Sequence, residues 1–468
     1  MTILAGLLAD IQQMQGPRFH GQVVTCSGLA LEVEGLERRL SVGDGCRAMA
    51  RDGRAVPCEV VGFRQGRAVL LPFAPLDGIG LGAQVEAGTA MGLVRPDQSW
   101  LGRVIDAFGR PVDGKGPIGR GDANRPLRAA PPPAFERRRM GARLETGIRV
   151  LDSFIPLCRG QRLGIFAGSG VGKSTLLAML ARSSAADVNV IGLIGERGRE
   201  VQEFIQDDLG PEGLARSVVI VATGDEPALA RRQAAYLTMA VAEYFRDGDQ
   251  DVLCLMDSVT RFAMAQREVG LSAGEPPTTK GYPPSVFAEL PRLLERAGPG
   301  TASTGDITAV FTVLVEGGDH DEPVADAVRG ILDGHVVMDR KIAERGRYPA
   351  IDVLKSVSRA LPACHADSEN RTITAVRTLL SRYEAMEEMI RLGAYRAGSD
   401  QEVDRAIKAY GPLQDFLRQQ KGESTPPADS FGALDGILAQ VEPPPAPAEP
   451  PPDAPAKGRA LTPARRTR

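Results

Sequence analysis

The sequence reads AGSGVGKS at residues 167–174, between the apolar run LGIF at 163–166 and the helix-forming run TLLAMLA at 175–181. A glycine-rich turn between a strand and a helix lets several backbone N–H groups converge on phosphate oxygens, and the helix N-terminus adds its dipole. The pattern therefore predicts a P-loop that binds a nucleoside triphosphate. Its first position holds Ala167 where the usual pattern has glycine, and the rest of the loop is intact.

Individual positions of this loop have separate expected roles. Lys173 is expected to reach the β- and γ-phosphates, and the hydroxyl of Ser174 is expected to ligate Mg²⁺. The nucleotide-binding residues predicted here are Gly168, Ser169, Gly170, Val171, Gly172, Lys173, Ser174 and Thr175, the last near the α-phosphate.

Two acidic residues follow apolar runs further along the chain. Asp257 closes the run VLCLM at 252–256, and Glu196 follows the run NVIGLI at 189–194. An acid at the carboxyl end of a buried strand suits the Walker B role, in which it orients Mg²⁺. Glu196 is expected to polarise the attacking water as a general base. A solvated charge run is the alternative interpretation of the GERGRE stretch that contains it.

Strands and helices alternate from about residue 145 to 365, which predicts an α/β domain with a largely parallel sheet. Parallel strands that are buried on both faces appear as continuous apolar runs. Residues 228–246 are expected to form one of the intervening helices. The candidate strands are Arg162–Phe166, Asn189–Ile194, Val218–Ala222, Val252–Met256 and Ile307–Val315.

Short β-rich runs separated by glycine turns occupy residues 19–95 and predict a small antiparallel β-barrel. Residues 96–144 are turn-rich and proline-rich, so we expect a linker there. The candidate barrel strands are Gln22–Cys26, Ala30–Val33, Ala55–Val61 and Arg67–Leu71.

The two ends of the chain differ from its middle. Residues 366–440 are dominated by helix formers and predict a C-terminal α-helical domain, and the proline-rich residues 441–468 predict a disordered tail. Residues 1–18 predict a short amphipathic helix with an apolar stripe at helical spacing. The stripe consists of Leu4, Leu7, Leu8 and Ile11.

Composition narrows the possible classes of protein. The formal net charge of −3 gives no electrostatic argument for nucleic-acid binding. The longest apolar runs are shorter than the roughly 20 residues that cross a bilayer, and the N-terminus lacks a basic region followed by a cleavage site. The 6 cysteines are scattered without a C-x-x-C pair, which favours a reduced, cytoplasmic setting.

Further motifs bear a family resemblance. The stretch PAIDVLKSVS at 349–358 resembles the signature of the rotary ATPase α/β subunit superfamily. The flagellar and type III secretion export ATPases are resembled by GERGREVQEFI, GYPPSVFAELPRLLERAG, EGGDHDEPVADAVRGILDGH and RYPAIDVLKSVSRA. The stretch GDHDEPVADAVRGILDGHVVMDRKIAERGRYPAI is closer to the flagellar branch. The resemblance covers roughly residues 20–440. It implies a RecA-like central domain and a Mg²⁺-dependent ATP hydrolase that energises the export of flagellar proteins.

The resemblance also assigns roles to single positions. Lys173 and Ser174 match the family's P-loop, Glu196 its catalytic glutamate, and Asp257 its Walker B acid. Further matches are Arg197 and Arg261 beside the catalytic centre, Tyr348 as the aromatic near adenine, and Arg359 as the arginine finger that reaches a neighbour's nucleotide. A second adenine-covering aromatic of the C-terminal domain has no clear match.

A set of partners is implied in the same way. The resemblance implies a homohexamer with active sites at subunit interfaces, a stator-like regulator (FliH), a central stalk protein (FliJ), the export gate, and export substrates with their chaperones. It implies no nucleic acid and only peripheral membrane association, at the cytoplasmic face of the inner membrane beneath the flagellar basal body. The apolar stripe of residues 1–18 is expected to bind the regulator or to pack on the barrel.

Four other functions remain as alternatives. An injectisome ATPase has the same chemistry. An ATP synthase catalytic subunit reads GERTREG where this chain has GERGREV, and it lacks the GYPPSVF stretch. A non-catalytic ring subunit has lost the lysine or the glutamate that this chain retains as Lys173 and Glu196. A hexameric RNA translocase needs a basic or aromatic platform, which residues 20–95 do not offer.

Overall fold

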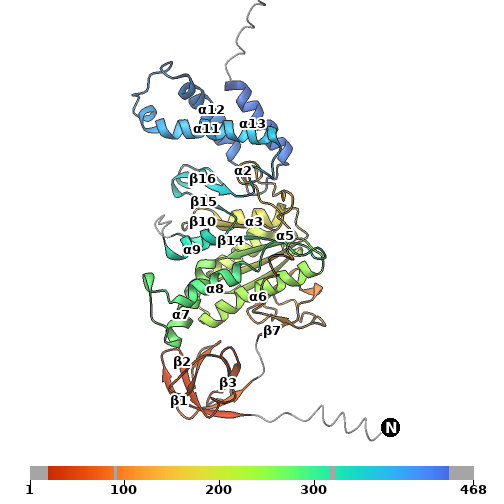
Figure 1. Cartoon of the computed structure of the whole chain (residues 1–468), viewed down its shortest axis with the longest axis vertical. Helices are drawn as coiled ribbons and strands as arrows, with labels where there is room; N and C mark the ends of the chain where they lie inside the picture. Colours follow the sequence, from red (N-terminus) through yellow and green to blue (C-terminus); the bar gives the residue numbers. More distant parts are fainter. Residues whose placement is uncertain (1–18, 89–91, 316–321, 442–468) are drawn as a thin grey trace, which may run out of the picture.

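The chain forms three stacked parts along its long axis, as the computed structural model shows for residues 19–88, 92–315 and 322–441 (Figure 1). A β-barrel lies at one end, a sheet flanked by helices occupies the middle, and a group of helices lies at the other end. The three-part fold class predicted from the sequence is confirmed. The predicted helix in residues 1–18 and the tail beyond residue 441 lie outside the described residues.

Six antiparallel strands close the barrel in the order β1-β2-β5-β4-β3-β6. Its interior is apolar because alternate side chains of each strand point inward, for example Leu31, Val33 and Leu70. Two of the strands, β3 and β6, are additional to those predicted. The strands are β1 (His20–Ser27), β2 (Ala30–Glu34), β3 (Gly45–Met49), β4 (Ala55–Arg64), β5 (Arg67–Pro72) and β6 (Gln84–Ala87).

The central sheet has eight strands in the order β16-β15-β10-β14-β13-β11-β12-β8, parallel except for the edge strand β16. All five candidate strands are present, and β8, β15 and β16 are additional. The expected linker at 96–144 supplies β8, which pairs with β12. The strands are β8 (Arg103–Asp106), β10 (Arg162–Ala167), β11 (Val188–Ile194), β12 (Ser217–Ala222), β13 (Val252–Asp257), β14 (Ile307–Leu314), β15 (Gly334–Met338) and β16 (Ile351–Ser358); β7 (Leu93–Val94) and β9 (Arg125–Pro126) form a separate pair.

Helices cover both faces of this sheet, and the strands β11 and β13 between them are accordingly buried along their whole length and mostly apolar. The helices are α2 (Arg149–Phe154), α3 (Lys173–Ser183), α4 (Gly198–Glu203), the π-helical η2 (Phe204–Leu209), α5 (Gly210–Ala215), α6 (Ala228–Asp247), α7 (Val259–Ala273), α8 (Pro284–Leu294), α9 (Pro323–Ile331) and α10 (Arg340–Glu344), with 3₁₀ turns at η1 (Gln98–Trp100) and η3 (Thr279–Gly281). Three helices form the C-terminal part: α11 (Asp367–Arg391), α12 (Gln401–Leu417) and α13 (Pro427–Val441). Within the described ranges, no helix combines the length and the apolar character needed to span a membrane.

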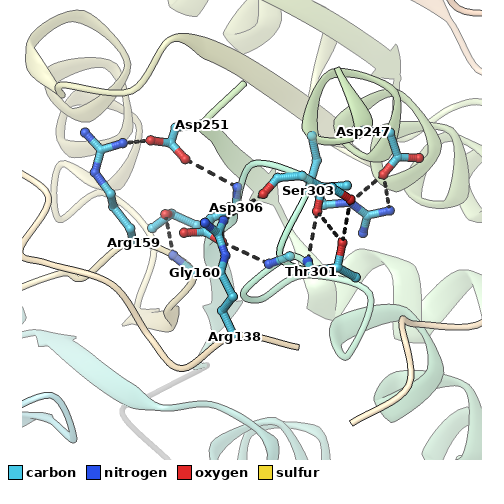
Figure 2. Close-up of polar contacts among 12 residues, drawn as sticks. Arg138, Arg159, Gly160, Asp247, Asp251, Thr301, Ser303 and Asp306 are labelled. Carbon is cyan, nitrogen blue, oxygen red and sulfur yellow. Dashed lines mark hydrogen bonds and ion pairs between the residues drawn. The ribbon is translucent and has the colours of Figure 1, made fainter. Parts of the chain in front are cut away.

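Ion pairs fix the parts to one another. Arg232 of α6 is buried and donates to both carboxylate oxygens of Glu59 in the barrel, at 2.7 and 2.8 Å. At the edge of the sheet where β13 and β14 begin, Arg138 donates to Asp306 at 2.7 Å and Arg159 pairs with Asp251 (Figure 2). The second network lies within the central part and ties the segments that precede β10 to the starts of β13 and β14.

Candidate functional site

The P-loop starts at Ala167, the last residue of β10, and ends at Ser174, the second residue of α3. Gly170 and Gly172 have φ values of +77° and +88°, a backbone conformation that glycine adopts without a Cβ clash. Residues 168–172 therefore turn back over the end of the strand, and α3 starts with its N-terminus at the loop. The side chain of Val171 is buried, which anchors the turn on the apolar side.

Three charged side chains meet beside this loop. The Nζ atom of Lys173 lies 2.5 Å from Oδ1 of Asp257 and 3.3 Å from Oε1 of Glu196. Glu196 follows β11 and Asp257 ends β13, so two neighbouring parallel strands bring both acids to the same edge of the sheet. The hydroxyl of Thr312, on β14, donates to the same oxygen of Asp257 at 2.7 Å. The sequence analysis did not identify Thr312, because threonine within an apolar strand gives no signal.

Burial and neighbouring charges shift the pKa values of Glu196 and Lys173 for different reasons. Burial, together with the nearby charge of Asp257, raises the pKa of Glu196 to about 7. Burial alone would lower the pKa of Lys173, but the attraction of Asp257 and Glu196 outweighs it and raises the pKa of this ammonium group. Lys173 is therefore held as a cation, and Glu196 can exchange a proton near neutral pH, as a general base must.

The two arginines expected beside the catalytic centre lie differently. Arg197 is exposed over 86% of its side chain and pairs with Glu200, so it lies away from the lysine and the two acids. Arg261 packs its stem against Gly195, where an added Cβ would approach it to 2.8 Å, and its buried Nε has no hydrogen-bond partner among the described residues. Arg261 thus lies directly under the turn that carries Glu196.

Arg359 lies at the opposite edge of the sheet from the P-loop. Strand β16 runs antiparallel to β15, so that Ser358 is opposite Gly334, at the start of β15. The backbone amide of Arg359 donates to the carbonyl of Asp333, whose own amide donates to the carbonyl of Arg162, the first residue of β10. The length of β10, at about 3.3 Å per residue, separates the exposed Arg359 from this chain's own P-loop.

A cavity of about 400 Å³ adjoins the P-loop helix. Tyr348 forms one wall, and its ring would lie 3.3 Å from a Cβ placed on Gly172. Residues 418–421, which follow α12, also line the cavity, and the backbone amide of Gln419 donates to the carbonyl of Tyr348 at 2.9 Å. Among the described residues that line this cavity, Tyr348 is the one aromatic. Residues 418–421 were not predicted, because they come from the far end of the chain and carry no nucleotide-binding motif.

The donor set beside the P-loop suits a small divalent cation. Among the described residues, no three His, Cys, Asp or Glu side chains form a metal cluster. Mg²⁺ needs only one or two protein oxygens besides phosphate and water, and Ser174 and Asp257 supply a hydroxyl and a carboxylate. These two residues therefore fit the metal role that the sequence predicted.

Known proteins share both the sequence and the fold. Residues 147–358 match the ATP synthase alpha/beta family nucleotide-binding domain, and residues 366–436 match the T3SS EscN ATPase C-terminal domain. The flagellum-specific ATP synthase of Caulobacter vibrioides is 56% identical over 93% of this chain and 99% of its own length. The chain belongs to the family of flagellum-specific ATP synthases. The member of this family from Bacillus subtilis is 48% identical, over 93% of this chain and 99% of its own.

Relatives outside the flagellum-specific ATP synthases show how far the likeness extends. The type 3 secretion system ATPase of Xanthomonas euvesicatoria is 47% identical over 90% of this chain and 93% of its own. The assembled ATPase EscN of enteropathogenic Escherichia coli superposes with a TM-score of 0.82 at 38% identity, over 89% of this chain and 100% of that one. EscN in complex with its central stalk EscO superposes with a TM-score of 0.80 at the same identity. The predicted family and the predicted ATP hydrolase activity are confirmed.

Proposed function

We propose that this chain hydrolyses Mg·ATP in a ring and energises the export of flagellar proteins through the flagellar type III export apparatus. The observation that carries the proposal is the convergence of Lys173, Glu196 and Asp257 at the P-loop, at 2.5 and 3.3 Å. A buried lysine beside two acids, one of them titrating near neutrality, suits phosphoryl transfer to water. The family supplies the biological setting.

The residues divide the work of hydrolysis. Lys173 and the P-loop amides bind the β- and γ-phosphates, which replaces the ammonium group's contacts with the acids. Glu196 then accepts a proton from the attacking water at its carboxylate, and Arg261 supports the turn that holds it. Mg²⁺ held by Ser174 and Asp257 would neutralise phosphate charge. The cavity beside Tyr348 receives the adenine, with residues 418–421 as its second wall.

The position of Arg359 suits a chain that assembles with copies of itself. Its position at the edge of the sheet away from the P-loop suits a residue that completes the active site of the next subunit. Head-to-tail contacts that close on themselves produce a ring, with one active site at each interface. The structure of the assembled EscN supports such self-association, and the family implies six subunits.

The same relatives suggest which proteins bind this chain. The complex of EscN with its central stalk EscO supports a stalk protein here, which we expect to be a FliJ homologue. We further propose a FliH-type regulator bound through residues 1–18, and contacts with the export gate and with chaperoned substrates. We therefore propose that the ring works in the cytoplasm, peripherally at the inner membrane. A chain lacking residues 2–14 should keep ATP binding and lose affinity for the regulator in calorimetric titration. Retained regulator affinity with a lowered melting temperature would instead place this segment on the barrel.

Purified protein tests the main proposal through the concentration dependence of ATP hydrolysis. Turnover per chain should rise steeply with protein concentration, because each active site needs an arginine from a neighbour. Turnover per chain that is constant from dilute to concentrated protein, with Arg359→Ala unaffected, would rule out shared sites. No hydrolysis under any condition would leave a purely structural ring subunit.

An injectisome ATPase is the second candidate function, because a type 3 secretion system ATPase is 47% identical to this chain. The two functions share their chemistry and differ in the exported proteins. Deletion of the gene should abolish motility and leave effector secretion intact if the flagellar proposal is right. The reverse pattern, or a gene neighbourhood of injectisome components, would favour the second candidate.

A further inference from the structure

The segment that follows α12 is joined to the central part of the chain at Gln419. This residue is buried, with 3% of its surface exposed, and it is one of the residues that line the cavity beside Tyr348. Its backbone amide donates to the carbonyl of Tyr348 at 2.9 Å. The C-terminal helical part therefore contacts, through Gln419, the residue whose ring forms one wall of this cavity.

The side chain of Gln419 uses both of its polar ends. Its Oε1 atom accepts from the backbone amide of Arg149, the first residue of α2, at 2.8 Å. Its Nε2 atom donates to the carbonyls of Gly147 and Glu423, at 2.7 and 3.0 Å. A side-chain amide accepts and donates at the same time, whereas a carboxylate only accepts and an apolar side chain does neither. The three partners therefore suit glutamine at this position.

Arg149 contributes its side chain to the same junction. Its Nε atom donates to the carbonyl of Phe416 at 2.9 Å, and its guanidinium also donates to the carbonyl of Arg418. Carbonyls at the C-terminal end of a helix, here α12, lack partners inside the helix and attract a cation. The backbone amide of Thr425 donates to the carbonyl of Gly147 at 3.0 Å. Both ends of the segment that contains Gln419 are therefore tied to the start of α2.

We propose that Gln419 is a positioning residue for nucleotide binding, which holds residues 418–421 beside Tyr348 and so sets the shape of the cavity that receives the base. This role rests on the proposed binding of adenine in that cavity. Both polar ends of the Gln419 side chain are engaged by protein groups, so the residue acts on the base through the cavity wall that it holds. A cavity that is already formed binds a flat ring without the cost of ordering its wall.

Loss of this junction should weaken nucleotide binding and leave the chemical step unchanged. Lys173, Glu196 and Asp257 are held by contacts within the central part, at the other side of the P-loop residues from the base. The base does not react, so its contacts are the same in the ground state and in the transition state. An interaction of this kind changes KM and not kcat.

The test compares the full-length wild type with Gln419→Met, which has a similar length and no amide. Calorimetric titration with ADP and Mg²⁺ should show binding weakened at least about tenfold, because a shift of about 1 Å in a binding surface can cost as much as about 10²-fold. Inorganic tripolyphosphate, which has no base, should bind the variant as it binds wild type. Steady-state assays should show KM for ATP raised by the same factor as the ADP dissociation constant, with kcat unchanged within about twofold.

Two further variants complete the comparison. Arg149→Met removes the guanidinium contacts to the end of α12 and should show the same pattern, because it loosens the same segment. Gln414→Met is the matched control, since Gln414 is half-buried on α12 and is not one of the residues that line the base cavity. It should bind ADP as wild type does. If circular dichroism shows that Gln419→Met does not fold, Arg149→Met decides in the same titrations.

Three results would overturn the role of Gln419. They are ADP binding in the variant equal to that of wild type, tripolyphosphate binding weakened as much as ADP binding, and a lowered kcat with KM unchanged. The ADP titration requires no hydrolysis. A wild type that binds ADP and does not hydrolyse ATP would therefore contradict the proposed function without deciding the role of Gln419, which the titrations measure separately.

Discussion

The ammonium group of Lys173 donates to Oδ1 of Asp257 across 2.5 Å, which joins the first residue of α3 to the last residue of β13. Glu196, at 3.3 Å, completes a buried cluster of one cation and two acids. The charge of the cluster is one unit negative when both acids are ionised. Lys173 supplies the positive charge of the cluster and Glu196 the carboxylate that exchanges a proton, so the consequences of replacing them differ.

Lys173→Ala should remove most of the affinity for ATP, because the phosphates lose their cation. A fluorescent ATP analogue measures the loss, and circular dichroism checks that the fold is retained. The exposed Lys341, on α10, offers a control: Lys341→Ala should bind ATP as wild type does. Unchanged affinity in Lys173→Ala would remove the P-loop assignment.

Glu196→Gln should retain ATP binding and lower the hydrolysis rate by about 10² or more, because the amide cannot accept the proton of water. Glu200 lies on the following helix and is half exposed, so Glu200→Gln is a matched change without the expected effect. Steady-state turnover compares the two variants. Near wild-type turnover in Glu196→Gln would mean that the water is activated by another group.

The pH dependence of kcat/KM should report the pKa of Glu196. Burial and the charge of Asp257 raise this pKa to about 7, so the base is protonated and inactive below that pH. We expect kcat/KM to fall as the pH drops through 7, and the residual activity of Glu196→Gln to lack this step. A midpoint near 4.5 in wild type would contradict a buried base.

Stability should change in the opposite direction over the same range. The folded protein retains a proton on Glu196 up to pH of about 7, whereas the unfolded chain releases it near 4.5. The folded state binds more protons in this window, so this residue's contribution to the free energy of unfolding decreases as the pH rises from 4.5 to 7. Urea denaturation at several pH values should show a flatter dependence in Glu196→Gln than in wild type.

Arg359→Ala and Lys173→Ala chains should each be nearly inactive alone and should recover activity when mixed. In a mixed ring, an interface between an intact P-loop and an intact Arg359 can still hydrolyse ATP. Subunit exchange is monitored by fluorescence energy transfer between labelled chains. Mixed rings without recovered activity would show that Arg359 does not act across the interface.

Arg296 and Glu243 test the stability of the central domain. Arg296 is 1% exposed and donates twice to the carboxylate of Glu243, at 2.8 Å each. Arg296→Met leaves that buried charge without a partner and should lower the free energy of unfolding by about 3–5 kcal/mol. Arg292→Met removes an exposed pair with Glu289 and should cost less than about 1 kcal/mol in the same urea titration.

The sequence predicted those elements whose pattern is local. The strands β10, β11, β12, β13 and β14 are continuous apolar runs because both of their faces are covered, and all five were predicted. The edge strand β16 alternates buried and exposed residues towards its end, and its sequence had been interpreted only as a family signature. Strand β8 lies in a turn-rich stretch, and its place in the sheet depends on pairing with β12.

Part of the candidate site could likewise be predicted from local sequence patterns, and part of it could not. Lys173, Glu196 and Asp257 follow strands of one parallel sheet, so their meeting could be expected from topology alone. The cavity wall at residues 418–421 depends on how the helical domain packs against the central one, which no local pattern encodes. Arg197 matches the family motif, yet its side chain is exposed and paired with Glu200, which a sequence match cannot reveal.

The separation of Arg359 from the P-loop across the sheet also has a genetic consequence. A chain defective at one of these two edges spoils one active site in a ring, and a chain defective at both spoils two. A doubly defective copy produced beside normal ones therefore removes more active sites than its share of the chains, whereas a singly defective copy removes only its share. A Lys173→Ala/Arg359→Ala double mutant, produced beside the normal chain, should therefore impair the export of flagellar proteins more severely than either single mutant.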